Sequence, residues 1–65
     1  MKITAKEMKQ ILNNNSMYIE TLGSTYKLKK NNIVKMTETY VEFYSEMLGY
    51  EEIVKFEEIR DFEII

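Results

Sequence analysis

The side chains in this sequence that could do acid–base chemistry are carboxylates that stand in pairs. The pairs are Glu51 with Glu52, Glu57 with Glu58, and Asp61 with Glu63. Paired carboxylates transfer protons when a pocket gives the two groups different environments, and 65 residues leave little room for such a pocket. The chain has no His and no Cys, so no serine has an imidazole partner for nucleophilic catalysis. We therefore predict a protein that is not an enzyme.

The same composition argues against a metal or cofactor site. A hard cation takes about six to eight oxygen ligands, commonly from a loop with regularly spaced acids, and the sequence has no such loop. Without His or Cys, a zinc site lacks its usual ligands. Gly23 and Gly49 are isolated glycines and form no phosphate-binding loop. We expect no metal, no cofactor and no small-molecule substrate.

Charge is divided unequally along the chain. Residues 1–35 carry seven lysines and two acids, a net charge of 7 − 2 = +5. Residues 36–65 carry nine acids against one lysine and one arginine, a net charge of 2 − 9 = −7. A surface of one sign attracts partners of the opposite sign and repels others. An acidic surface of this kind can imitate the phosphates of DNA and occupy a basic channel of a nucleic-acid-handling protein.

Two sets of side chains are candidates for contacting a protein partner. The acidic set is Glu38, Glu42, Glu46, Glu57, Glu58, Asp61 and Glu63. The aromatic set is Tyr18, Tyr40, Tyr44 and Tyr50. Tyrosine is enriched at interfaces because it brings a large contact area and a polar tip at low entropic cost. The competing explanation is that the acids form a solvated face that keeps the protein soluble.

The basic half supplies an alternative function. Its candidate residues are Tyr26, Lys27, Lys29, Lys30 and Lys35, in a lysine-rich hairpin over residues 26–35. Lysines beside an aromatic ring suit a nucleic-acid backbone and a stacked base. Lysines on an edge strand also prevent aggregation, which is a purely structural explanation. The opposite charges of the two halves also allow a self-assembling structural protein or a homodimer.

The elements that position these residues begin with a helix. Thr4 and Glu7 have the spacing of a capping box, which predicts a helix over about residues 4–13. Its apolar face is Ala5, Met8, Ile11 and Leu12. Asn13-Asn14-Asn15 is expected to end it, because Asn tolerates left-handed geometry. Strands are expected at residues 17–22, 25–30 and 33–36, the last two joined by a type I′ turn at Asn31-Asn32.

Residues 37–48 fit two structures. As a helix, Tyr40 to Leu48 would place apolar residues at helical spacing, with Glu38, Glu42 and Glu46 as an exposed ridge. As a strand, residues 39–44 form a dense run of β-branched and aromatic side chains between turns at 37–39 and 47–49. The strand is our preferred interpretation. A strand from residue 51, a turn at Glu57-Glu58 and a last strand over residues 60–65 would complete the fold.

We therefore expect a single domain over residues 1–65 of the α+β class. The N-terminal helix would be followed, over about residues 17–65, by a small, strongly curved antiparallel sheet. The alternative is a two-helix α+β fold in which residues 37–48 are helical. A core this small is marginal, so association with a protein partner or a second copy would add stability.

Two resemblances bear on fold and function. The strand, turn and strand from Asn32 to Phe43 resemble those of small barrels of the SH3-like and Sm-like type. The segment from Ile53 to Ile59 is similar to the closing strand and turn of such barrels. In size, acidity and lack of motifs, the chain resembles small phage and prophage inhibitor proteins such as anti-CRISPR proteins. That resemblance implies an inhibitor of a host enzyme that handles nucleic acid.

The expected function is a non-enzymatic protein-binding module. Its acidic C-terminal half would contact the basic surface of a nucleic-acid-handling protein, and nucleic acid itself ranks second as a partner. The N-terminal residues contain no apolar signal core, and no segment approaches the roughly 20 apolar residues of a membrane span. We therefore expect the protein in the cytoplasm of a bacterial or phage-infected cell, without membrane contact.

Overall fold

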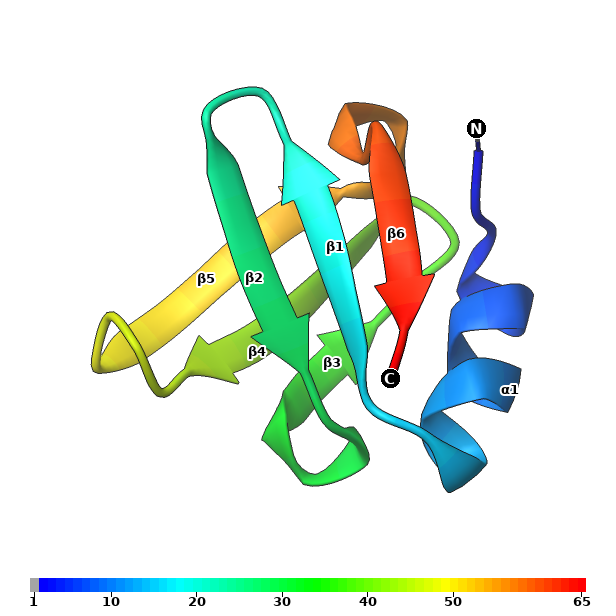
Figure 1. The fold of residues 1–65 in the computed structure, drawn as a ribbon, viewed down its shortest axis with the longest axis horizontal. Helices are drawn as coiled ribbons and strands as arrows, with labels where there is room; N and C mark the ends of the chain where they lie inside the picture. Colours follow the sequence, from blue (N-terminus) through cyan, green and yellow to red (C-terminus); the bar gives the residue numbers. More distant parts are fainter. Residues whose placement is uncertain (1) are drawn as a thin grey trace.

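One helix and two three-stranded antiparallel sheets make up the fold in the computed structural model, which describes residues 2–65 (Figure 1). The elements are α1 (Ala5–Asn14), β1 (Met17–Thr21), β2 (Ser24–Leu28), β3 (Ile33–Met36), β4 (Tyr40–Ser45), β5 (Tyr50–Lys55) and β6 (Asp61–Ile64). Short 3-10 turns, η1 (Lys30–Asn32) and η2 (Phe56–Glu58), precede β3 and β6. The strand orders are β2-β1-β6 and β3-β4-β5. The α+β class is confirmed, and six strands form close to the six segments expected as strands, but they make two three-stranded sheets instead of one sheet.

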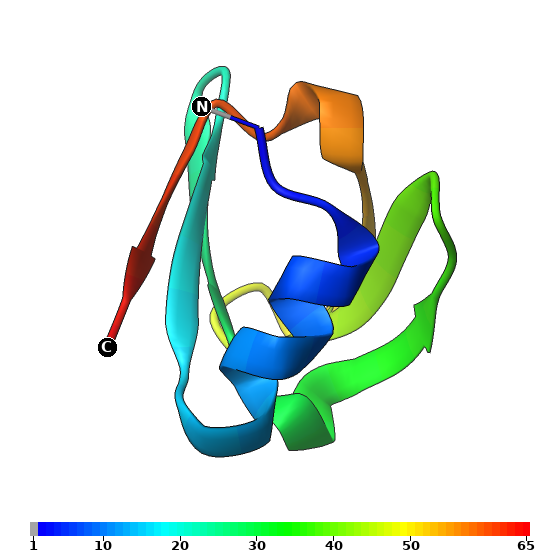
Figure 2. The same cartoon turned by 90° about the vertical axis from the view of Figure 1, so that its right-hand side faces the viewer.

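The capping box at the start of α1 is confirmed. The Thr4 hydroxyl accepts a hydrogen bond from the Glu7 N–H at 3.2 Å, and the Glu7 carboxylate accepts one from the Thr4 N–H at 3.0 Å. At its other end the helix runs into extended backbone at Asn15, with φ of −136°, so the expected left-handed ending is wrong. Figures 1 and 2 show α1 at one side of the molecule, in front of the opening between the two sheets, and its Met8 and Leu12 are buried.

Residues 40–45 form strand β4, so the helical alternative for residues 37–48 is wrong. Val41, Phe43 and Ser45 are buried, while the residues between them face outward. This alternation lets β4 bury one face and bond to β3 and β5 on its two sides. The Phe43 ring meets the Tyr26 ring of β2 edge-on, with centroids 5.4 Å apart. The predicted ridge of Glu38, Glu42 and Glu46 does not exist in this geometry.

The predicted hairpin at Asn31-Asn32 is also wrong. β2 pairs with β1 across a turn at Leu22-Gly23, and β3 pairs with β4. Gly23 has a φ of +88°, which a tight turn there requires, whereas no non-glycine among the described residues has positive φ. The turn at residues 37–39, the β4–β5 hairpin and the final strand are confirmed, with β6 spanning Asp61–Ile64.

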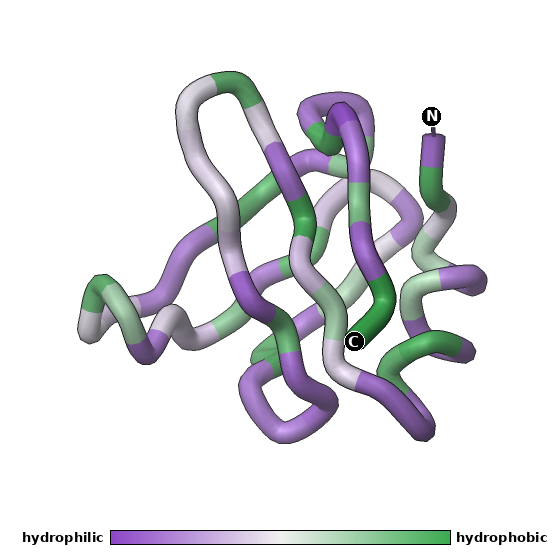
Figure 3. Tube along the Cα trace, viewed as in Figure 1, coloured by the Kyte–Doolittle hydropathy of each residue, from purple (hydrophilic) through white to green (hydrophobic). Residues whose placement is uncertain are grey.

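The core is formed by inward-facing side chains of α1, of the two sheets and of the segments that join them. Its buried members are Ile3, Met8, Leu12, Met17, Ile19, Leu28, Val41, Phe43, Val54, Phe56 and Ile59. Hydrophilic and hydrophobic residues alternate along β6, as Figure 3 shows. Among residues 2–65, no helix combines the length and apolar character that a membrane crossing needs.

Replacing Phe43 with alanine should cost about 3–5 kcal/mol of unfolding free energy, because it empties a fully buried site between the two sheets. That is most of the stability of a small domain. The matched control is Tyr44→Ala, one position along on the outward face, where we expect a change of about 1 kcal/mol or less. Urea unfolding would measure both, and equal losses at the two positions would contradict the alternation of β4.

Candidate functional site

Tyr18 lies at the centre of the outer face of the sheet β2-β1-β6. The register places it between Lys27 of β2 and Glu63 of β6. Two residues further along β1, on the same face, Glu20 lies between Thr25 and Asp61. These side chains point away from the core because their neighbours Met17 and Ile19 are fully buried on the inner face. An open depression of ≈ 390 Å³ is lined by Tyr18, Ile19, Glu20, Thr25, Asp61, Phe62 and Glu63.

Further carboxylates lie at the end of this sheet where η2 passes into β6. The Arg60 N–H donates to the carbonyl of Glu20 at 2.7 Å, which holds η2 and its Glu57 beside the end of β1. The Phe56 N–H donates to the carbonyl of Thr39 at 2.9 Å, which places the turn carrying Glu38 beside the start of η2. That turn lies on the side of the molecule away from β1 and β6 (Figure 2), so Glu38 is not part of this group of carboxylates.

We call these residues the acidic surface: Tyr18, Glu20, Glu57, Glu58, Asp61 and Glu63. All six are exposed. The neighbouring cations are Lys27, which is opposite Tyr18 in the ladder, and Lys55 and Arg60, which flank η2. Within residues 2–65, no ion pair within 4 Å joins any of these three to the surface. Two members have local backbone roles: Glu58 accepts from the Lys55 N–H at 2.9 Å, and Asp61 accepts from the Phe62 N–H at 2.8 Å.

Sequence analysis identified every member of the acidic surface except Glu20. Glu20 belongs to the basic half of the chain by sequence, and only the pairing of β1 with β6 brings it to Asp61. The sequence could have indicated Glu20 through its position two residues after Tyr18 on a predicted strand, because residues two apart on a strand share one face.

The remaining predicted partner-binding residues lie elsewhere. Tyr40, Glu42 and Tyr44 face outward on the other sheet, where Glu42 is opposite Lys35. Tyr50 and Glu46 flank the turn of the β4–β5 hairpin. The structure therefore divides the predicted acidic and aromatic sets between two sheets and a hairpin end.

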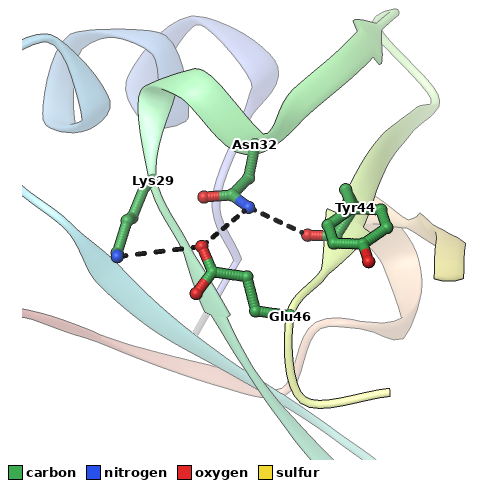
Figure 4. Close-up of polar contacts among 4 residues, drawn as sticks. All are labelled: Lys29, Asn32, Tyr44 and Glu46. Carbon is green, nitrogen blue, oxygen red and sulfur yellow. Dashed lines mark hydrogen bonds and ion pairs between the residues drawn. The ribbon is translucent and has the colours of Figure 1, made fainter. Parts of the chain in front are cut away.

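A second polar cluster joins η1 to the end of β4 (Figure 4). The Asn32 amide donates to the carbonyl of Tyr44 at 3.2 Å and to the carboxylate of Glu46 at 3.3 Å. The Lys29 ammonium lies 3.8 Å from the same carboxylate. Asn32 thus supplies a donor to β4 beyond the last backbone pair with β3. The cluster borders a groove of ≈ 450 Å³ between β2 and the β4–β5 turn, where Met47 and Leu48 are exposed.

The residues of the predicted nucleic-acid site are not gathered on one surface. Tyr26 is half-buried against Phe43, so its ring is engaged in the core. Lys27 faces outward from one sheet and Lys35 from the other. Lys29 is paired with Glu46, and Lys30 lies in η1.

Among residues 2–65, no three acidic side chains converge in an arrangement that could hold a metal ion. Comparison with protein-family models, curated proteins and solved structures finds no match to this chain. The geometry of the candidate site places exposed carboxylates around one tyrosine.

Replacing Asn32 with alanine should lower the unfolding free energy by about 0.5–1.5 kcal/mol, because the Tyr44 carbonyl loses its side-chain donor. Asn32→Asp should cost more, since it sets a carboxylate against that carbonyl and against Glu46. Asn31→Ala, at the exposed neighbouring position, is the control, with an expected change within about 0.5 kcal/mol. Equal effects at positions 31 and 32 in urea unfolding would remove the role given to the Asn32 amide.

Proposed function

We propose that this protein is a non-enzymatic protein-binding module that contacts the basic surface of a nucleic-acid-handling protein. The contact would be made by the acidic surface around Tyr18. In its concrete form the protein is a small inhibitor of the phage or mobile-element type, which keeps nucleic acid from its host target by occupying the same basic surface.

The observation that carries the proposal is the position of Tyr18 among three carboxylates. Glu20, Asp61 and Glu63 come from two neighbouring strands and line one depression with it. A lysine or arginine of a partner can meet carboxylates there while its stem lies on the aromatic ring. Because exposed charges act over distance, the acids of η2 would also steer a basic partner toward this face.

We also infer that the two sheets form a small barrel of the SH3-like type, open at two seams. The pairing order supports this inference, since the chain passes from β2 to β3 through η1 and from β5 to β6 through η2, and β6 returns to β1. Within residues 2–65, no ladder joins β2 to β3 and none joins β6 to β5, so the two seams would lie at these junctions.

The proposal is tested by capturing a partner from nuclease-treated bacterial lysate and measuring its affinity after purification. Glu20→Gln with Glu63→Gln should weaken binding by about tenfold or more, which is roughly 1.4 kcal/mol. Tyr18→Ala should do the same through lost contact area. Binding should also weaken as salt rises, because the charges are exposed.

The matched control is Glu42→Gln with Glu52→Gln, which removes the same charge from the other sheet and should leave affinity unchanged. A partner whose capture disappears with nuclease, or whose affinity depends on Lys27 and Lys30 instead, would contradict the proposal and favour the nucleic-acid alternative. Affinity reduced equally by both double variants would show that only net charge matters.

A further inference from the structure

The two sheets end in four edge strands, β2, β6, β3 and β5. β5 is the longest of these, with six residues from Tyr50 to Lys55. An edge strand presents unpaired backbone N–H and C=O groups and is a ready template for another strand. On β5 this edge lies beside an exposed apolar side chain, since Ile53 is 58% exposed.

The hydrogen-bond pattern identifies which residues of β5 face the free edge. The Phe56 N–H donates to the Thr39 carbonyl, in register with the β4–β5 ladder. Because bonded pairs alternate along antiparallel strands, Val54 and Glu52 also bond to β4. The backbone groups of Glu51, Ile53 and Lys55 therefore point to the free edge, where the Lys55 N–H is already taken by the Glu58 carboxylate.

The side chains of the same three residues face outward from the sheet, and their order is acidic, apolar, basic. If a second β5 lies antiparallel with Ile53 opposite Ile53, each Glu51 is opposite the Lys55 of the other copy. Opposite charges directly across a ladder stabilise it, and like charges destabilise it. If the pairing were centred on Glu51 or on Lys55 instead, that residue would lie opposite its own copy, and two like charges would face each other.

We propose that β5 is the interface of a symmetric homodimer, in which two copies pair antiparallel through a twofold axis at Ile53. The two three-stranded sheets β3-β4-β5 would then join into one. Backbone bonds would run between the two Ile53 residues and from each Glu51 N–H to the Lys55 carbonyl of the second copy. The Glu58 carboxylate occupies the Lys55 N–H, so the exposed edge ends at that point.

The other edges fit this role less well. The two acids of β6, Asp61 and Glu63, would face like charges in a symmetric pair. β3 has four residues and a register shift between Ile33 and Lys35. β2 carries Lys27 on its outer face, with no acid on that strand to pair with it. The dimer interface shares only Glu58 with the acidic surface, and this inference does not depend on the proposed function.

The test uses charge reversals read by sedimentation equilibrium and native mass spectrometry. The wild-type chain should form a species of twice the 7.8 kDa of one chain as concentration rises. Glu51→Lys alone and Lys55→Glu alone should each weaken dimerisation by about tenfold or more, because both ion pairs become repulsive. Mixing these two variants should restore a dimer made of one copy of each, since every Lys then faces a Glu.

Glu63→Lys and Lys27→Glu are the matched controls, with the same charge changes outside β5, and should leave the wild-type dimer intact. Far-ultraviolet circular dichroism of each variant would check that the fold is retained. A wild-type chain that remains at 7.8 kDa at its highest soluble concentration would overturn the proposal. A dimer that survives both single reversals, or mixed variants that fail to combine, would overturn it equally.

Discussion

The rest of the structure depends on the alternation of buried and exposed residues along β4. Its inward side chains Val41 and Phe43 are fully buried, and Phe43 is the point at which the two sheets meet, through Tyr26. Ser45 ends this face with its hydroxyl satisfied by the Leu48 N–H at 3.2 Å. Because β4 is central in its sheet, the same alternation determines which side chains of β3 and β5 face inward.

The fold redistributes the charge that the sequence divides into two halves. Strand pairing brings Glu20 from the basic half to Asp61 from the acidic half, and sets Lys27 on the other side of Tyr18 from Glu63. The acidic surface is consequently a property of one sheet face and of the turn that follows β5. The edge of β5, which carries both signs, is a separate surface with different chemistry.

What could be predicted from the sequence was local. The capping box of Thr4 and Glu7 involves residues three apart, and the strand character of residues 39–44 follows from their side-chain types. The prediction of a hairpin at Asn31-Asn32 was wrong because the alternating side chains of β2 would allow it to pair with either β1 or β3. The turn at Gly23 and the match of Ile19 with Tyr26 favour β1.

The missed features depend on contacts between distant residues. The Asn32 amide reaches the Tyr44 carbonyl twelve positions away, and a polar side chain in a turn gives no sign of such a contact. For the candidate site, five of its six members were predicted by residue type, whereas Glu20 required the pairing of β1 with β6. Their assembly around Tyr18 is a result of topology, which residue types alone do not specify.

The central claim is that the outer face of the sheet β2-β1-β6 is the binding surface for a basic protein. The most direct measurement is an amide chemical-shift map of the ¹⁵N-labelled chain titrated with its purified partner. The account predicts the largest changes at Tyr18, Glu20, Asp61 and Glu63, reduced by added salt. Changes confined to η1 and to Lys29, Lys30 and Lys35, with the Tyr18 face unaffected, would contradict it.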